Sequence, residues 1–297
     1  MRYLLRRVAV IGVCCAACLG LVAVPASYAV NIYGLTSTNG LIRFDSASPG
    51  TVTTIGTISQ AGIVDIDFYP ANGLLYGMTA NGTAYRINTT TAVATGATPA
   101  SATFTAGAVG TVTDFDFNPG ADRMRVFTNG STNQNYRVEP DIVTAPQTSV
   151  APGTVTTDGA FTGVAGFVPV ANAYINNFDG AASTTLYSIN TTNDSLAIHS
   201  VGPQFNTVAT VGTTLGVTIG SNVGFDVGQN GIAYLSNDNS LFTVDLVTGV
   251  ATSAGTVGGT GLVSIAVTAS PVPEPGVVGL GVAAALCGIV GYARRKK

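Results

Sequence analysis

The sequence is poor in the residues that carry most protein chemistry. Tryptophan is absent, the only histidine is His199, and charged residues make up 9% of the 297 positions. This composition is typical neither of a disordered chain, which is highly charged, nor of a helical protein rich in Leu, Ala, Glu and Lys. The 37 glycines, with frequent Thr, Val and Asn, favour short strands that are joined by tight turns.

Cysteine and lysine are both missing from the centre of the chain. All four cysteines lie in two apolar runs near the ends, and the only lysines are the last two residues. Disulfides, zinc sites with cysteine ligands and cysteine nucleophiles are therefore excluded between these runs. Between Val30 and Pro275, five arginines stand against 15 Asp and Glu, a net charge of −10. Such an acidic segment repels phosphate backbones, so no nucleic-acid partner is expected.

The first 29 residues have the three-part layout of a secretory signal peptide. Three arginines occur within residues 1–7, an apolar run covers residues 8–24, and small residues stand at positions −3 and −1 of a cut after Ala29. We therefore expect export through the Sec machinery and removal of residues 1–29 by signal peptidase, with cleavage at Ala29. A membrane anchor that stays in place is the alternative.

The C-terminus combines a Pro-rich linker, an apolar stretch and a basic end. Residues 270–275 close on Pro273, Glu274 and Pro275, residues 276–292 are apolar, and residues 293–297 contain two arginines and two lysines. A helix of this apolar length reaches about 25 Å, enough to cross a thin bilayer. A transmembrane helix over residues 276–292 is therefore predicted, with a basic cytoplasmic tail over residues 293–297.

In this order, the three C-terminal parts closely resemble the PEP-CTERM sorting signal. The resemblance covers about the last 26 residues and implies that an exosortase recognises Pro273, Glu274 and Pro275 and cuts the tail. It also implies a Gram-negative host that makes exopolysaccharide or biofilm matrix. The protein would pass through the inner membrane in transit and end outside the cell or on its surface. A plain C-terminal anchor, or a periplasmic or inner-membrane protein with an uncut tail, is the alternative.

Residues 30–269 repeat a pattern of short strands. Apolar first strands that end in Phe-Asp-Phe-Asn-Pro or a similar sequence are predicted at residues 64–70, 113–119 and 223–229. Second strands with a central Tyr or Val follow at residues 32–36, 75–79, 125–129, 173–177 and 233–237. Third strands are predicted at residues 41–45, 84–88, 135–139, 186–190 and 241–245, and a fourth strand follows each of them except the one at residues 135–139. The second strands recur at intervals of 43, 50, 48 and 60 residues, which is typical of the four-stranded blades of a β-propeller.

We therefore predict an all-β fold, a β-propeller of about five four-stranded blades with an irregular blade around residues 144–170. The chain enters on a second strand at Ile32 and leaves on a segment like a first strand over residues 262–268, so the last strand can complete the first blade and close the ring. A β-solenoid or a pair of sandwiches is the alternative. These repeats, over roughly residues 31–268, also resemble an uncharacterised family of secreted bacterial domains of unknown function, which implies no known activity.

Three aspartates, Asp67, Asp116 and Asp226, recur at the same place in their units. One interpretation is a ring of carboxylates at a mouth of the propeller that binds a cation or a sugar. The other, which the repetition favours, is a set of structural acids that accept backbone hydrogen bonds. Turns rich in Asn and Asp at residues 176–180 and 237–239 carry oxygen ligands suited to Ca²⁺ but lack the EF-hand spacing. No metal site and no cofactor is therefore predicted, with Ca²⁺ as the alternative.

No catalytic motif accompanies His199. The sequence contains no G-x-S-x-G, no H-E-x-x-H and no phosphate-binding glycine loop, so we predict no catalytic residue and no enzyme. The expected function is a non-catalytic binding protein or a component of a biofilm or exopolysaccharide matrix, with extracellular polysaccharide as a partner. The alternative is a secreted carbohydrate-active enzyme that uses carboxylates at a propeller mouth. Arg123, Arg125 and Arg137, concentrated in one unit, are the asymmetry that favours this alternative.

Overall fold

The computed structural model describes residues 29–96, 110–130, 134–140, 151–259 and 261–268. Within these ranges, 20 β-strands form five sheets of four strands each. Among the residues described, no helix combines the length and the apolar character that a membrane crossing needs. The predicted Pro-Glu-Pro box, transmembrane helix and basic tail lie outside these ranges, as does the predicted signal peptide except for the exposed Ala29.

Each sheet is one blade of four antiparallel strands that follow one another from the centre of the molecule outwards. Blade 1 contains β20 (Leu262–Val267), β1 (Asn31–Thr36), β2 (Gly40–Asp45) and β3 (Ser48–Thr57). Blade 2 contains β4 (Ile63–Phe68), β5 (Leu75–Thr79), β6 (Ala84–Ile87) and β7 (Ala94–Gly96). Blade 3 contains β8 (Val112–Asn118), β9 (Arg123–Thr128), β10 (Asn135–Val138) and β11 (Val155–Gly159). Blade 4 contains β12 (Pro169–Tyr174), β13 (Leu186–Asn190), β14 (Ser195–His199) and β15 (Val208–Val211). Blade 5 contains β16 (Val223–Val227), β17 (Ala233–Asn237), β18 (Ser240–Val244) and β19 (Ala251–Thr256).

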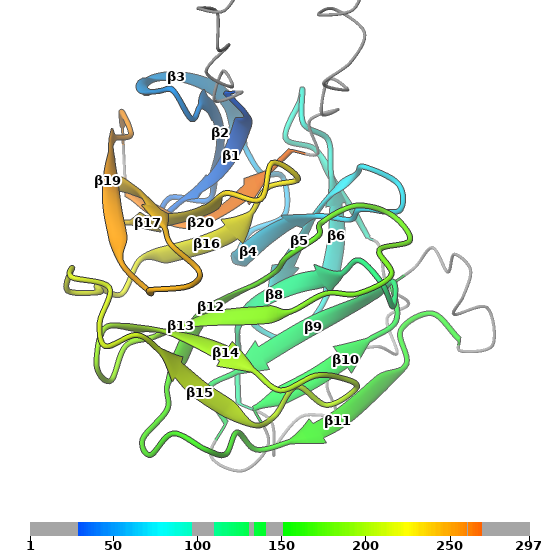
Figure 1. The fold of residues 1–297 in the computed structure, drawn as a ribbon. Helices are drawn as coiled ribbons and strands as arrows, with labels where there is room; N and C mark the ends of the chain where they lie inside the picture. Colours follow the sequence, from blue (N-terminus) through cyan, green and yellow to red (C-terminus); the bar gives the residue numbers. More distant parts are fainter. Residues whose placement is uncertain (1–28, 97–109, 131–133, 141–150, 260, 269–297) are drawn as a thin grey trace, which may run out of the picture.

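The five inner strands form a closed ring. Strand β4 contacts β8, β8 contacts β12, β12 contacts β16, β16 contacts β20, and β20 returns to β4. Figure 1 shows these strands gathered near the middle of the molecule, with β3, β11, β15 and β19 at its periphery. The predicted five-bladed propeller is thus confirmed. The predicted closure is confirmed as well, because β20 pairs with β1 and completes the blade that the N-terminal strands begin.

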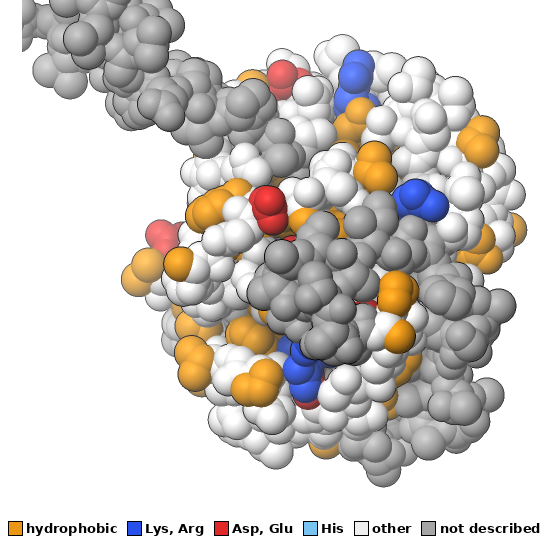
Figure 2. Space-filling model, turned by 90° about the vertical axis from the view of Figure 1, so that its right-hand side faces the viewer, with side chains coloured by type: hydrophobic (Ala, Val, Ile, Leu, Met, Phe, Trp, Pro, Cys, Tyr) orange, Lys and Arg blue, Asp and Glu red, His pale blue; other side chains and the backbone are white. Residues whose placement is uncertain are grey.

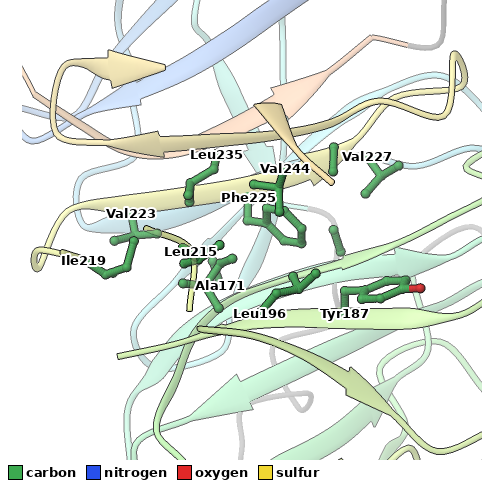
Figure 3. Packing of buried hydrophobic residues seen from close by; sticks show 13 residues of the cluster. Ala171, Tyr187, Leu196, Leu215, Ile219, Val223, Phe225, Val227, Leu235 and Val244 are labelled. Carbon is green, nitrogen blue, oxygen red and sulfur yellow. The ribbon is translucent and has the colours of Figure 1, made fainter. Parts of the chain in front are cut away.

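Apolar side chains hold neighbouring blades together. Between blades 4 and 5, Ala171 and Leu196 meet Val223, Phe225 and Leu235 in one buried cluster, in which side chains from the two sheets face each other (Figure 3). Alternation along each strand sends successive side chains to opposite faces, so every blade contributes to two such interfaces. The main stabilising contribution therefore comes from apolar surface buried between blades and not from a single central core.

Aromatic rings fill the interface between blades 2 and 3. Tyr69 stacks on Phe117 with ring centroids 4.4 Å apart, and Tyr76 meets the same Phe117 edge-on at 5.1 Å. Aromatic pairs in these geometries add about 0.5–1.5 kcal/mol beyond the area they bury. Charged side chains are sparse on the face seen in Figure 2.

The strand assignment from sequence is wrong in blade 4. Residues 173–177 are predicted as a second strand, but Ala173 and Tyr174 end the inner strand β12. Residues 186–190 are predicted as a third strand but form β13, the second strand of the blade. The irregular blade therefore lies later than predicted, and each of its strands is displaced by one place in the repeat.

The physical reason is a change of side chains on the inner strand. Register across the first two strands of a blade identifies equivalent positions: Asp67 lies opposite Tyr76, and Ala173 lies opposite Tyr187. Blade 4 therefore has alanine where the first strands predicted at residues 64–70, 113–119 and 223–229 have aspartate, so the acidic residue shared by those three strands is absent from its sequence.

Candidate functional site: carboxylates of the propeller channel

Two positions on each inner strand recur around the ring. The first position contains Asp67, Asp116, Ala173, Asp226 and Ala266. The second, two residues earlier on each strand, contains Asp65, Asp114, Ala171, Gly224 and Ser264. Residues two apart on a strand lie on the same face, so the two positions form adjacent layers.

The structure brings the three aspartates of the first layer together. A carboxylate oxygen from each of Asp67, Asp116 and Asp226 lies within 4.8 Å of the other two, and all three side chains are buried. Their exposed fractions are 2%, 2% and 1%. The three acids singled out in the sequence therefore converge inside the ring of inner strands.

Asp65 and Asp114 in the second layer extend this set to five carboxylates, and sequence reasoning missed them. Both are buried. The signal was present, because Asp65 precedes Asp67 and Asp114 precedes Asp116 by two residues, the spacing of neighbours on one face of a strand. We call these five carboxylates the channel acids.

Each channel acid accepts a backbone hydrogen bond from the next blade. In blade 2, Asp65 and Asp67 accept from the amides of Phe115 and Phe117 at 2.6 and 2.9 Å. The other three acceptors and their donors are Asp114 with Asn172 at 2.7 Å, Asp116 with Tyr174 at 3.3 Å, and Asp226 with Val267 at 2.5 Å. The acids thus satisfy amides on the free edge of the neighbouring inner strand and join one blade to the next.

Blade 5 departs from this pattern at Gly224. A Cβ at this position would lie 2.4 Å from the backbone nitrogen of Ile265 in blade 1. Because no side chain fits in that space, glycine is required for the close approach of β16 to β20.

Burial raises the pKa of every channel acid. The pKa of Asp65 is raised to about 6 and that of Asp226 to about 7, in both cases mainly because the charged form loses its hydration. Burial, followed by repulsion from neighbouring carboxylates, raises the pKa values of Asp67, Asp114 and Asp116 well above the usual range for Asp. None of the five forms an ion pair with any described residue, so the set has no counter-ion within these parts of the chain.

Asn172 places an unpaired oxygen beside these acids. Its side-chain amide donates to the carboxylate of Asp114, while its Oδ1 is buried and has no hydrogen-bond partner among the described residues. A buried oxygen without a donor is destabilising by about 1–3 kcal/mol. It is satisfied if a cation or a proton donor lies next to it.

The ligand types fit a hard divalent cation. The channel presents carboxylates, the amide oxygen of Asn172 and the hydroxyl of Ser264, and Ca²⁺ takes oxygen ligands of these kinds at about 2.3–2.6 Å. Oxygens bound to one such ion lie at most about 5 Å apart, and the 4.8 Å limit for Asp67, Asp116 and Asp226 meets this condition. The spacing of Asp67, Asp116 and Asp226 therefore allows one oxygen of each to bind the same cation.

His199 lies away from the channel acids, in a closed pair with Ser188. The imidazole Nε2 is 2.8 Å from the Ser188 hydroxyl, and Nδ1 is 2.8 Å from the carbonyl oxygen of Phe205. Burial lowers the pKa of His199 to about 4, so the ring is neutral at pH 7. Ser188 is fully buried, and among the described residues the histidine contacts the Ser188 hydroxyl and the Phe205 carbonyl and no carboxylate.

The turns rich in Asn and Asp use their side chains to support loops. The amide of Asn176 donates to the Ser183 carbonyl, that of Asn237 to Thr218, and that of Asn239 to Gly259, each at 2.9 Å. These bonds satisfy loop carbonyls, which is the usual role of such residues in turns.

Comparison with known proteins relates most of the chain to one family. Residues 40–266 match the family model described as Domain of unknown function (DUF4394). No curated protein is significantly similar in sequence.

Three bacterial proteins are among the solved structures that are similar to this chain. An auxiliary nutrient binding protein from Bacteroides ovatus shares 13% identity over 65% of this chain, with a TM-score of 0.42, and this chain covers 42% of its length. A calcium-binding protein, regucalcin, from Agrobacterium tumefaciens shares 14% identity over 80% of this chain and 73% of its own, with a TM-score of 0.45. A putative 6-phosphogluconolactonase from Bacteroides uniformis shares 12% identity over 78% of this chain and 83% of its own, with a TM-score of 0.41. No function is transferred from likenesses at this level.

Proposed function

The chain belongs to the family described as Domain of unknown function (DUF4394), and we propose that it is an exported, non-catalytic binding protein whose propeller channel holds a divalent cation, Ca²⁺ being the best fit. The observation that carries the cation site is the convergence of Asp67, Asp116 and Asp226, whose oxygens lie within 4.8 Å of one another in a buried channel. The buried, unpaired Oδ1 of Asn172, whose side-chain amide contacts Asp114, is a further oxygen next to the channel acids.

The charge of the channel explains why a cation is needed. Five buried carboxylates without a counter-ion are strongly destabilising unless they take up protons or bind a cation. The raised pKa values describe the first outcome, in which protons occupy the acids. A divalent cation replaces those protons, so its binding releases protons and weakens as the pH falls.

Burial of the same acids supports a binding role over catalysis. A glycoside hydrolase needs two carboxyl groups on either side of an accessible sugar, whereas Asp67, Asp116 and Asp226 are at most 2% exposed. The Ser188–His199 pair, the other arrangement in the described residues that resembles catalytic chemistry, is closed to solvent. Among these groups, no open site supports the alternative function, a secreted carbohydrate-active enzyme.

Export and surface location rest on the sequence signals alone. The signal peptide ending at Ala29 and the box of Pro273, Glu274 and Pro275 support Sec export, exosortase sorting and a place on the cell surface or in an exopolysaccharide matrix. Extracellular modules bind Ca²⁺ with dissociation constants of about 10⁻⁴–10⁻³ M. An affinity in this range suits a protein that is exposed to Ca²⁺ only after export.

Calorimetric titration of the mature protein tests the cation site. After removal of metals by a chelator, CaCl₂ should bind at one site per chain, and Asp116→Asn should weaken binding at least tenfold. Asp116 is the cleanest position to change because its side chain accepts one backbone hydrogen bond, which an Asn oxygen can also accept. The matched control is Asp179→Asn, at an exposed loop residue, which should bind Ca²⁺ like the wild type.

Two results would contradict the cation site. One is wild-type protein that takes up neither Ca²⁺ nor Mg²⁺ at millimolar concentration. The other is an Asp116→Asn protein that folds and binds Ca²⁺ with unchanged affinity.

A further inference from the structure

A second polar site lies beside the channel, where blade 3 meets loops of blade 4. A pocket of about 460 Å³ opens there, and its lining includes Arg123, Arg125, Arg137, Tyr174 and Phe205. Small-molecule sites in proteins typically have volumes of about 300–1,000 Å³. The three arginines concentrated in one unit of the sequence therefore line a single cavity of ligand size.

Arg125 forms a fixed wall of this pocket. Its side chain is 1% exposed, and its Nη1 donates to Asp158 at 2.6 Å and to Asn135 at 2.7 Å. Its Nη2 donates to the Pro203 carbonyl at 2.9 Å, and its Nε donates to the Tyr174 hydroxyl at 3.1 Å. Every nitrogen of Arg125 thus makes at least one hydrogen bond, so this guanidinium contributes charge and shape to the pocket from a fixed position.

Arg137 is held in place and still has a donor to offer. Its Nε and Nη2 bind the two oxygens of Asp158 at 2.7 and 2.8 Å, a fork that fixes the guanidinium plane. Its Nη1 has no hydrogen-bond partner among the described residues, and the side chain is 18% exposed. A preorganised, partly exposed N–H group in a cavity is the kind of group that recognises an anion.

The local charge favours a ligand with one negative charge. Asp158 is shared between Arg125 and Arg137, so one carboxylate faces two guanidinium groups and leaves a net charge of +1. Arg123 pairs with Glu139 and is balanced. A phosphate dianion would exceed the available charge.

The remaining lining defines the rest of the ligand. Asn118, Ser183 and Thr184 supply amide and hydroxyl groups, while Pro203 and Phe205 supply apolar surface. Groups of both kinds match a ring with hydroxyls on its edge and apolar C–H groups on its face. We infer that this pocket binds a carboxylate-bearing sugar, such as a uronic acid, with the sugar carboxylate on the Nη1 group of Arg137.

Titration with defined sugars tests this site. Galacturonate and glucuronate are the probes, glucose is the neutral control and inorganic phosphate is the competing anion, each titrated in chelator and again in excess CaCl₂. The mature wild-type protein should bind the uronates in both buffers and should bind glucose and phosphate at least tenfold more weakly. Binding that persists in chelator separates this site from the proposed cation site, because only the latter requires the channel to take up metal.

Two substitutions of Arg137 test whether this residue contacts the sugar carboxylate. Arg137→Gln should lower uronate affinity at least tenfold, and Arg137→Lys, which keeps the charge but lacks the fork, should lower it less. The matched control is Arg43→Gln on β2, where the arginine is exposed and remote from the pocket, and it should leave the affinity unchanged. If Arg137→Gln does not fold, Arg137→Lys carries the test, and unchanged affinity in a folded Arg137 variant overturns the assignment.

A parallel arm separates the two sources of such a ligand. Monomeric galacturonate represents a free sugar acid, and an oligogalacturonide represents a residue within a polysaccharide. Binding in either arm supports the proposal. The absence of binding in both arms, or equal affinity for glucose and glucuronate, overturns it.

Discussion

The central channel and the pocket beside blade 3 touch through Tyr174, yet the chain builds them from different parts of its repeat. The channel uses residues that recur from blade to blade, and the pocket uses residues that occur in one blade. The difference is sharpest opposite the channel aspartates. Asp67 and Asp226 face Tyr76 and Tyr234 across their strand pairs, whereas Asp116 faces Arg125. In this propeller, residues that recur in several blades line the central axis, whereas residues found in one blade line the pocket.

Replacement of Arg125 should have the largest effect on the pocket region. Arg125→Met would remove the buried donor of the Asn135 amide oxygen and the Pro203 carbonyl, and it would leave Asp158 with Arg137 as its remaining ion-pair partner. Loss of one partner from a buried ion pair costs about 3–5 kcal/mol, so the free energy of unfolding in urea should fall by about that amount. A drop below about 1 kcal/mol would show that the pocket wall contributes little to the fold, and Arg43→Gln is the matched surface control.

The channel should respond to pH in the opposite sense to a salt-bridged acid. The pKa of Asp226 is about 7 in the folded protein against an ordinary 3.8, so the folded state holds more protons than the unfolded state between these values. Without divalent cations, the free energy of unfolding should therefore fall as the pH rises from about 4 to about 7, by a few kcal/mol. The raised pKa of Asp65, about 6, acts in the same direction.

Urea unfolding at several pH values in chelator and in excess CaCl₂ measures this effect. Calcium replaces the protons in the channel, so the fall in stability should disappear when the ion is present. Asp226→Asn should flatten the curve in chelator, while Asp179→Asn should not. A stability that rises over this range in chelator would contradict the raised pKa values and the cation site together.

Much of this architecture can be predicted from the sequence, because the strand pattern repeats from blade to blade. The strand over residues 262–268 that closes blade 1 follows from its likeness to a first strand, and the grouping of Asp67, Asp116 and Asp226 follows from their equal places in three units. The displaced assignment in blade 4 has a local cause, since Ala171 and Ala173 remove the acidic pattern from β12.

Other parts of the site depend on the folded chain. The link between Arg125 and Asp158 joins β9 to β11, 33 residues apart, and no local pattern predicts which acid meets which arginine. The unpaired oxygen of Asn172 is visible only once blade 4 lies against Asp114. Sequence patterns describe single blades, whereas these features arise between strands and between blades.

Tyr174 connects the two regions, and its effect should be the smallest measured. Its backbone amide donates to Asp116 at 3.3 Å, and its hydroxyl accepts from Arg125 at 3.1 Å. A cation bound to Asp116 therefore affects Tyr174, which contacts Arg125 in the pocket wall. Because linkage is reciprocal, Ca²⁺ and glucuronate should alter each other's affinity by the same factor, which we expect to be about fivefold or less.

Tyr174→Phe isolates this connection, because the change removes the hydroxyl and keeps the backbone amide on Asp116. In this variant the factor by which Ca²⁺ changes glucuronate affinity should fall to about one, while Ca²⁺ affinity measured alone stays within about twofold of the wild type. Tyr85→Phe, at a tyrosine of blade 2 that lines neither site, is the control and should keep the wild-type factor. If coupling survives in Tyr174→Phe, the channel and the pocket communicate by another path, and the two regions are less separate than their different origins in the repeat suggest.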